Sequence, residues 1–236
     1  MMKIFKRKKQ TTTTAAQQQK MILDESSPFI LQEAYKTMRT NLLFALRGNG
    51  CKRFCITSGV PGEGKSITIL NLAISIAQTG KKVLLIDADL RRPALARLLG
   101  EDPIPGVSNV LVGQANVENA IRESIRTNLD VLFAGDVPPN PSELLGSEQM
   151  QELIETMSRE YDYVLVDAPP VNLVSDCCIV ASLLDGIVLL ARSGVARKDG
   201  VKQAINQLRM TNTKILGCVL NGVEVAAKKY YRYNYK

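Results

Sequence analysis

The chain has 236 residues, of which 45% are hydrophobic, so it is long enough for one large domain with a sizeable buried core. Its formal net charge of +7 is concentrated at the two ends: residues 1–9 and 228–236 contain nine of the 30 cations, and the rest of the chain has 21 basic and 23 acidic residues. This near-neutral body argues against a nucleic-acid-binding domain, whereas basic ends suit an anionic membrane surface or an acidic partner.

The five cysteines are odd in number and form no Cys-x-x-Cys motif, so we interpret them as reduced thiols, with packing in the core as their ordinary role. The longest apolar stretches, such as ITILNLAISIA (67–77), are too short to cross a bilayer, and no signal peptide is visible. We therefore expect an intracellular protein.

The first 22 residues are basic and then of low complexity (TTTTAAQQQ), which predicts a disordered N-terminus. A helix is predicted over about 28–47, with Ser27 as N-cap and Pro28 at the first helical position. Glycines at 48 and 50 end it. Its apolar residues recur at helical spacing: Ile30, Leu31, Ala34, Met38, Leu42 and Ala45.

Apolar, β-branched segments then alternate with helical patterns. These predicted strands are residues 53–57, 83–87, 129–135, 163–167, 186–191 and 215–221. Near-continuous apolar strands that alternate with helices are typical of a parallel sheet covered on both faces. We therefore predict an α/β fold with a mostly parallel central sheet, and a ligand site beyond the C-terminal ends of its strands.

The first strand leads into SGVPGEGKS (58–66), which fits G-x-x-x-x-G-K-[ST] between a strand and a helix. Glycines let consecutive backbone N–H groups hold phosphate oxygens, and the positive end of the next helix adds to this attraction. Lys65 is placed to reach the β- and γ-phosphates and Ser66 to bind Mg²⁺. The alternative is a chance Gly-rich turn, which the flanking strand and helix disfavour. The predicted nucleotide-binding residues are Gly59, Val60, Pro61, Gly62, Glu63, Gly64, Lys65, Ser66 and Ile67.

Acidic residues end two further predicted strands. Asp87 ends the strand VLLID, Asp89 follows two residues later, and Asp167 ends YVLVD. A carboxylate at such a position can hold Mg²⁺ directly or through water. A helix cap or turn is the alternative for each one alone, but three acids beside a phosphate loop favour the metal.

These motifs resemble the bacterial tyrosine kinases of the Gram-positive capsule and exopolysaccharide type, specifically their cytoplasmic catalytic chain. The resemblance runs from about residue 22 to the end. It rests on SGVPGEGKS as Walker A, LLIDADLRRP (84–93) as Walker A′, VLVDAPP (164–170) as Walker B, PPNPSELL (138–145), EAYKTMRTNL (33–42) and a tyrosine-rich tail. It implies the P-loop fold of the MinD and ParA relatives, a kinase domain over 23–225 and a separate tail over 226–236.

The resemblance also implies the activity. ATP and Mg²⁺ would serve transfer of the γ-phosphoryl group to the chain's own tail tyrosines, Tyr230, Tyr231, Tyr233 and Tyr235, and so regulate polysaccharide synthesis and export. The implied catalytic residues are Lys65, Asp87, Asp89 and Asp167, with Ser66, Asp87 and Asp167 around the metal and Asp89 orienting or deprotonating the tyrosine. Asn221 resembles a base-reading asparagine, although a turn asparagine looks the same. Arg91 and Arg92 are open between charge stabilisation and packing or pairing with an acid.

Partners follow from the same resemblance. Relatives form rings, here expected to be octamers, through Glu-x-x-Arg-x-x-Arg; this chain has Glu33, Lys36 and Arg39, with a lysine that cannot make arginine's bidentate contact. An ordinary solvated face is the alternative for this stripe. We expect trans-phosphorylation in the ring, an adaptor that recruits the cytoplasmic chain to the inner face of the membrane, a cognate phosphotyrosine phosphatase, and no nucleic acid.

A second hypothesis is a MinD- or ParA-like ATPase switch that controls assembly at a membrane or on DNA without kinase activity. Val60 argues against it, because those proteins have a signature lysine at the aligned position, and so does the tyrosine cluster. A pure scaffold is disfavoured by the intact phosphate site.

Overall fold

The computed structural model describes residues 19–46, 48 and 50–223. Most of the predicted disordered N-terminus and the whole tail over 226–236, with its four tyrosines, lie outside the described residues, so the proposed division into three parts stays a prediction. Among the described residues, no helix combines the length and apolar character needed to span a membrane.

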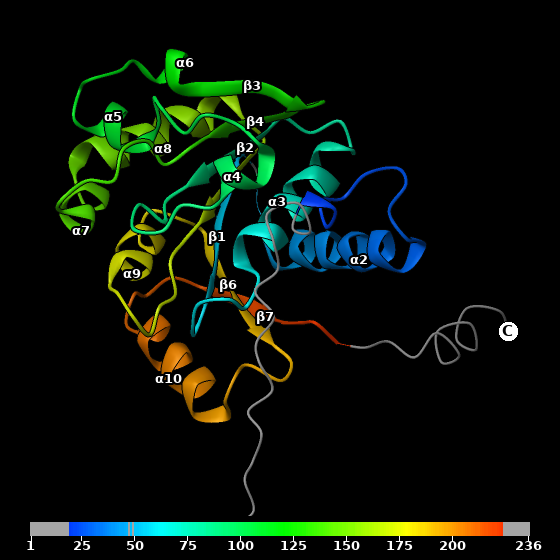
Figure 1. Cartoon of the computed structure of the whole chain (residues 1–236). Coiled ribbons are helices and arrows are strands. Elements are labelled where there is room, and N and C mark those ends of the chain that lie inside the picture. The colour runs from blue at the N-terminus through cyan, green and yellow to red at the C-terminus, as the bar shows by residue number, and fades with distance from the viewer. Residues whose placement is uncertain (1–18, 47, 49, 224–236) are drawn as a thin grey trace, which may run out of the picture.

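A seven-stranded sheet forms the centre of the molecule, in the order β3-β4-β2-β5-β1-β6-β7 (Figure 1). All neighbouring strands are parallel except β3 and β4. This confirms the predicted mostly parallel α/β sheet. Its strands are β1 (Lys52–Ser58), β2 (Val83–Asp87), β3 (Ile121–Arg126), β4 (Leu129–Leu132), β5 (Tyr163–Asp167), β6 (Gly186–Arg192) and β7 (Ile215–Asn221).

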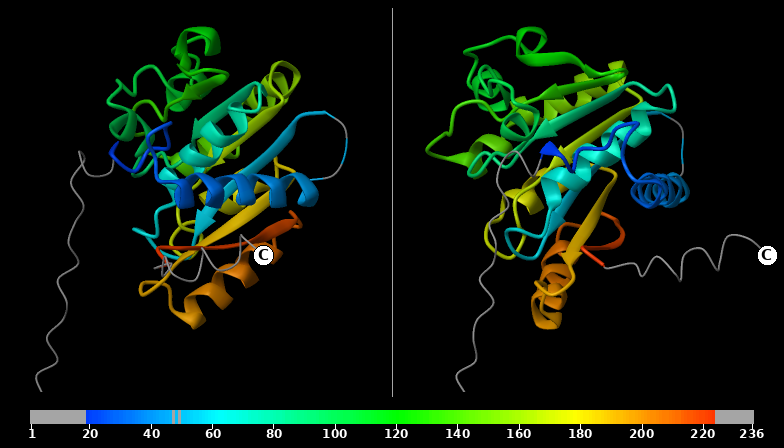
Figure 2. Two further views of the ribbon diagram at one scale, coloured as in Figure 1. Left: turned by 90° about the vertical axis from the view of Figure 1, so that its right-hand side faces the viewer. Right: turned by 45° about the vertical axis from the view of Figure 1, so that its right-hand side comes forward.

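Helices cover both faces of the sheet. The side chains of β2 alternate between the two covered faces, because successive residues of a strand point in opposite directions: Leu84 and Ile86 pack in one core cluster, Val83 and Leu85 in the other. Figure 2 shows α2 lying beside α3 on one face. That face carries α2 (Phe29–Ala45), α3 (Lys65–Ala77) and α4 (Leu95–Leu99). The other carries α5 (Val107–Leu111), α6 (Val117–Ala120), α7 (Pro141–Leu145), α8 (Glu148–Glu160), α9 (Asp176–Ala181) and α10 (Lys198–Arg209).

The order of the strands brings the predicted site together. β5 lies between β2 and β1, and Asp167 at its end pairs in register with Asp87 on one side and Ile56 on the other. Because these strands are parallel, their C-terminal ends meet at one edge of the sheet. The phosphate loop, which follows β1 directly, therefore begins one strand away from Asp167 and two strands away from Asp87.

The predicted first helix is confirmed as α2, but it begins differently from the expectation. Ser27 is not its N-cap and Pro28 is not its first helical residue: Pro28 is the N-cap and the helix begins at Phe29. The Ser27 hydroxyl donates to the Asp24 carboxylate and accepts from the Asp24 backbone N–H. The side chain that was expected to cap the helix instead closes a tight turn before it.

Candidate functional site

The phosphate loop passes from the end of β1 into the first turn of α3. The first hydrogen bond of that helix runs from Thr68 N to Gly64 O, at 3.0 Å. The backbone N–H groups of residues 65–67 therefore have no acceptor within the helix, and they lie where an anion is favoured. Gly64 has φ of 95°, and a Cβ there would lie 2.5 Å from Asn221 Nδ2, so only glycine fits. The loop thus has the backbone form that phosphate binding needs.

The loop is held in shape by its own Glu63. This side chain is 1% exposed, and its carboxylate accepts from Val60 N at 3.1 Å and from Arg192 N, at the end of β6, at 3.2 Å. The Glu63 carbonyl accepts from Asn221 Nδ2 at 2.8 Å. Glu63 therefore ties the loop to the ends of two strands, a role that the sequence motif alone did not indicate.

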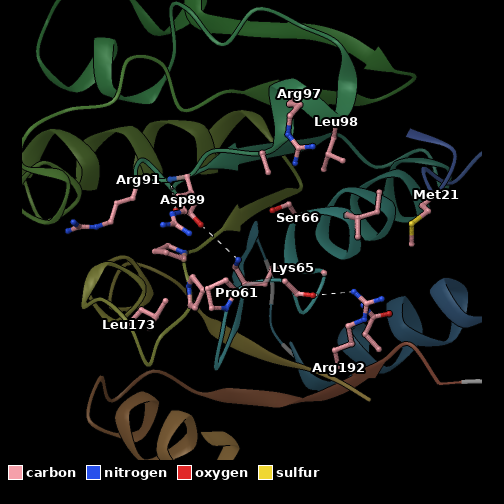
Figure 3. Close-up of a pocket in the computed structure, with 18 of the residues that line it drawn as sticks. Met21, Pro61, Lys65, Ser66, Asp89, Arg91, Arg97, Leu98, Leu173 and Arg192 are labelled. Carbon is pink, nitrogen blue, oxygen red and sulfur yellow. Dashed lines mark hydrogen bonds and ion pairs between the residues drawn. The ribbon is translucent and has the colours of Figure 1, made fainter. Parts of the chain in front are cut away.

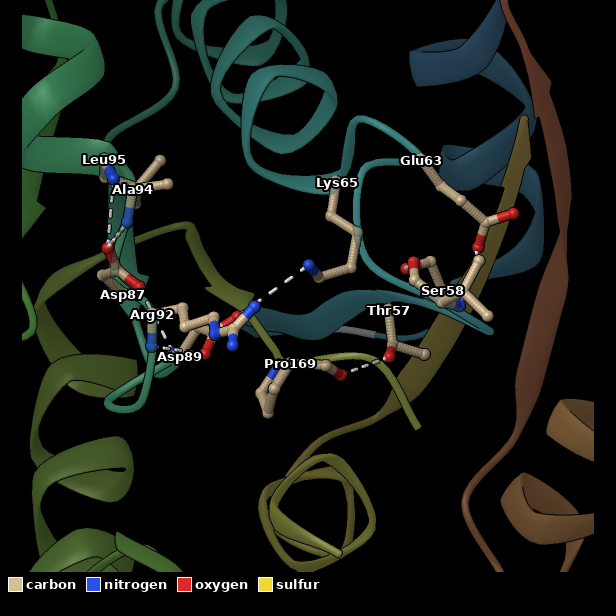
Figure 4. A network of polar contacts seen from close by, with 11 residues as sticks. Thr57, Ser58, Glu63, Lys65, Asp87, Asp89, Arg92, Ala94, Leu95 and Pro169 are labelled. Carbon is tan, nitrogen blue, oxygen red and sulfur yellow. Dashed lines mark hydrogen bonds and ion pairs between the residues drawn. The ribbon is translucent and has the colours of Figure 1, made fainter. Parts of the chain in front are cut away.

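The side chains of Lys65, at the N-terminus of α3, and of Asp89, two residues after the end of β2, point toward each other (Figure 4). The distance from Lys65 Nζ to Asp89 Oδ2 is 3.9 Å, and both residues are buried. Burial raises the pKa of Asp89, and the lysine charge acts in the opposite direction. The other Asp89 oxygen accepts from Arg92 N at 3.1 Å. A carboxylate held here, with a raised pKa, is suited to accept a proton.

Asp87 and Asp167 form the deepest part of the site, and both are 0% exposed. Asp87 accepts hydrogen bonds from the backbone N–H groups of Asp89, Ala94 and Leu95. Burial, followed by repulsion from Asp167, raises the pKa of Asp87 to about 8. Burial raises the pKa of Asp167 to about 6, against the attraction of Lys65. Two adjacent buried carboxyl groups thus need a cation before both ionise readily.

The fit to Mg²⁺ rests on Asp167. Both of its carboxylate oxygens are buried and have no hydrogen-bond partner among the described residues. Unpaired buried oxygens of this kind are costly unless a ligand meets them. No group of three or more His, Cys, Asp or Glu side chains in the described part of the chain is arranged to hold a metal. The predicted set of two carboxylates and the Ser66 hydroxyl would need phosphate and water oxygens to complete it, as is usual for Mg²⁺.

A cavity of about 580 Å³ lies over this edge of the sheet (Figure 3). Its cationic lining residues, Lys65, Arg91, Arg92, Arg97 and Arg192, outnumber the one lining carboxylate, Asp89. Such an excess of positive charge around a glycine loop favours a polyanion such as a triphosphate. Its lining also includes Pro61, Gly62, Gly64, Ser66, Ile67 and Asn221, which belong to the predicted nucleotide-binding set.

Arg91 is held in an ion pair rather than pointing freely into the cavity. Its Nε donates to Asp176 Oδ2 at 2.7 Å and its Nη2 to Asp176 Oδ1 at 3.1 Å, and Ser142 donates to the same carboxylate at 2.6 Å. Asp176 is 0% exposed. For Arg91, pairing with an acid is therefore observed. No motif in the sequence indicated Asp176, although Ser142 lies in the stretch PPNPSELL.

The remaining predicted site residues are placed as follows. Asn221 lines the cavity, with its amide donating to the loop carbonyl described above, so a role in reading the base stays a prediction. On α2, Glu33 pairs with Lys36 at 2.8 Å, whereas Arg39 binds the Ser75 carbonyl and hydroxyl of α3. The three-residue stripe is thus divided between a surface pair and an internal contact.

Comparison with known proteins agrees with this geometry. Residues 52–217 match a family described as AAA domain. The chain is 42% identical over 201 residues to tyrosine-protein kinase YwqD of Bacillus subtilis, covering 85% of each chain. It is 38% identical over 203 residues to tyrosine-protein kinase CpsD of Streptococcus agalactiae, covering 86% of this chain and 88% of the relative. The chain belongs to the bacterial tyrosine kinase family.

Solved structures place this bacterial tyrosine kinase in the same fold. The kinase domain of the Escherichia coli tyrosine kinase ETK superposes with a TM-score of 0.80 at 36% identity, covering 87% of this chain and 80% of that one. MinD from Pyrococcus horikoshii, in complex with Mg-ADP, gives a TM-score of 0.62 at 26% identity and covers 72% of this chain and 70% of that one. The chain is a protein-tyrosine kinase with an ATP-binding P-loop fold, as its motifs predicted.

Proposed function

We propose that this kinase phosphorylates its own C-terminal tyrosines in trans within an oligomeric ring and thereby regulates capsular or exopolysaccharide synthesis and export. The observation that supports it best is the arrangement of Lys65 and Asp89, 3.9 Å apart beside the phosphate loop, with Asp89 on the same side of Lys65 as Arg91 and Leu173 (Figure 3). A phenol that enters from this side meets the transferred phosphoryl group and a carboxylate together.

The transfer needs positioning and charge neutralisation more than covalent help. The bond from the γ-phosphorus to the bridging oxygen of ADP breaks as the phenol oxygen binds that phosphorus, and the phenol proton goes to Asp89. Lys65 and the first-turn N–H groups of α3 hold the phosphate oxygens. Mg²⁺, held by Ser66, Asp167 and Asp87, would supply neutralisation of phosphate charge.

The tail is favoured as the acceptor because the tyrosines of the described region are already engaged. The Tyr161 hydroxyl donates to Asp130 at 2.8 Å, Tyr163 is 8% exposed, and the Tyr35 hydroxyl accepts from Asn71 at 3.2 Å. Burial raises the pKa of all three phenols. Their oxygens are therefore poorly available for transfer, which supports Tyr230, Tyr231, Tyr233 and Tyr235.

Phosphorylation of the tail would also act as a charge switch. Each phosphotyrosine adds about 1.5–2 negative charges near neutral pH, so four of them add about six to eight. The segment 228–236 contains four cations, so this change turns its net charge from positive to negative. A tail that is attracted to acidic surfaces before modification is then repelled from them, which favours dissociation of the ring. A membrane adaptor would activate the kinase at the inner face of the membrane, and a phosphotyrosine phosphatase would reset it.

The test is phosphotyrosine mapping by mass spectrometry after incubation with ATP and Mg²⁺, in the presence of a candidate adaptor tail. We expect label on the four tail tyrosines of the wild type, almost none after all four are changed to Phe, and none in Lys65→Met, whose fold is kept. Label mainly on Tyr35, Tyr161 or Tyr163 would contradict the proposal. ATP hydrolysis without any phosphotyrosine would favour a MinD-like switch instead.

A further inference from the structure

Asn71 of α3 fixes the segment that precedes α2. Its side chain is 1% exposed, and all of its hydrogen-bonding groups have partners in the protein. Asn71 Oδ1 accepts from Leu23 N at 2.7 Å, and Nδ2 donates to Met21 O at 2.8 Å and to Tyr35 Oη at 3.2 Å. Two of these bonds hold the backbone at Met21 and Leu23, on either side of Ile22. A buried amide with this set of partners fixes the path of the segment.

These hydrogen bonds place the Met21 side chain at the cavity beside the phosphate loop. Ile67 and Asn71 are four residues apart on α3 and so lie on one face of that helix, the face to which residues 21–23 are attached. Met21, Ile67 and Leu98 all line the cavity. The Met21 side chain is not buried in the core: the residue is 49% exposed. Its thioether is therefore free to meet a ligand.

The cavity has two ends with different chemistry. In Figure 3, Asp89 and Arg91 lie on one side of Lys65, and Met21 and Leu98 lie on the other. In-line transfer puts the acceptor and the leaving group on opposite sides of the transferred phosphorus. If the phenol arrives beside Asp89, the nucleoside extends toward Met21.

We propose that Met21 covers the nucleobase of bound ATP and that Asn71 is the residue that positions it. The inference rests on the proposed function, because it takes ATP as the phosphoryl donor and Asp89 as the acceptor side. A flexible, polarisable thioether makes favourable contacts with an aromatic ring, and a purine base offers such a ring. Met21 would add affinity for the nucleoside and none for the phosphates.

The test compares two ligands that share phosphates but differ in the nucleoside: Mg-ATP and Mg-tripolyphosphate, measured by calorimetric titration of the full chain. Met21→Ala should weaken Mg-ATP binding about 2- to 10-fold, the range expected for a lost contact between sulfur and an aromatic ring, and leave tripolyphosphate affinity unchanged. Met210→Ala is the matched control, because Met210 is 83% exposed and does not line this cavity. It should change neither affinity.

Asn71→Ala separates positioning from general damage. If Asn71 acts through Met21, its variant loses affinity for Mg-ATP alone, and the double variant binds Mg-ATP as weakly as Met21→Ala. A general loss of structure would lower both affinities. The inference is overturned if Met21→Ala binds Mg-ATP like wild type or weakens both ligands equally. The inference is also overturned if the wild-type protein binds tripolyphosphate but not Mg-ATP. If the wild-type protein binds neither ligand, the proposed function is overturned as well.

Discussion

Asp87 and Asp167 end neighbouring parallel strands in direct register, so two fully buried carboxyl groups lie side by side at one edge of the sheet. Burial is the larger cause that raises the pKa of Asp87, and repulsion from Asp167 adds to it. Three backbone N–H groups support Asp87, whereas Asp167 has no hydrogen-bond partner among the described residues. Without a cation beside it, this pair opposes its own ionisation, which is why we propose it as the metal site.

The first prediction concerns pH in the absence of Mg²⁺ and nucleotide. Asp87 ionises near 3.8 in the unfolded chain and at about 8 in the folded one, so the folded state binds a proton that the unfolded state has lost. The resulting contribution to stability is present below pH 3.8 and is lost as the pH rises to about 8. Urea unfolding in EDTA should therefore show a free energy of unfolding that falls relative to Asp87→Asn between pH 5 and pH 8. Parallel curves for the two proteins would contradict it.

A second prediction separates the three acids. Asp167→Asn and Asp87→Asn should weaken Mg²⁺-dependent binding of nucleotide, because each removes a negative charge from the proposed metal site. Asp89→Asn should spare binding and lower transfer, because its carboxylate faces Lys65 at 3.9 Å and is the proposed proton acceptor. Nucleotide affinity and phosphotransfer are measured on the same three proteins. Equal losses of affinity would show that Asp89 belongs to the metal shell.

The third prediction distinguishes two neighbouring arginines. Arg91→Ala leaves the buried Asp176 carboxylate without its bidentate partner and should lower the free energy of unfolding by about 1–3 kcal/mol. Arg92→Ala is the matched control: it also lines the cavity, so it should weaken Mg-ATP binding while changing stability little. Thermal unfolding and nucleotide titration of both variants check this. If Arg91→Ala is as stable as Arg92→Ala, the ion pair contributes nothing to the fold.

The positions of the strands and of the phosphate loop could be predicted because their signals are local. β2, β5 and β7 begin and end where their apolar runs do, and the loop is defined by a contiguous motif. β3 was missed because its sequence, IRESIR, is charged and half exposed. This is usual for an edge strand, which has a neighbouring strand on one side and solvent on the other. The apolar pattern that marks buried strands is absent from it.

Contacts between distant residues could not be predicted in the same way. Glu63 bonds to Arg192, Arg91 to Asp176 and Asn71 to Leu23, across 129, 85 and 48 positions of the chain. None of these pairs has a spacing that periodicity or a motif would reveal. For Arg39, helical spacing correctly grouped it with Glu33 and Lys36, but its bonds to Ser75 depend on how α2 packs against α3.

The last prediction tests the ring by comparing the surface pair Glu33 and Lys36 with Arg39, whose contacts are internal. Glu33 and Lys36 pair with each other at the surface, with side chains 31% and 47% exposed, and such a pair contributes about 0–1 kcal/mol to stability. Their joint change to Ala should therefore leave the thermal unfolding midpoint almost unchanged. If they form the ring contact, light scattering should show a monomer, and tail phosphorylation should fall because the acceptor arrives from a neighbour.

Arg39→Ala is the contrasting variant, because Arg39 bonds to Ser75 within the same chain. It should lower the unfolding midpoint by loosening α2 from α3, whether or not a ring forms. If the particle mass is unchanged in the Glu33 and Lys36 variant but reduced in Arg39→Ala, the surface pair makes no subunit contact and belongs to an ordinary solvated face. This outcome would also show that the ring depends on how firmly α2 is held. A reduced mass in the surface variant at unchanged stability would instead identify Glu33 and Lys36 as the contact between subunits.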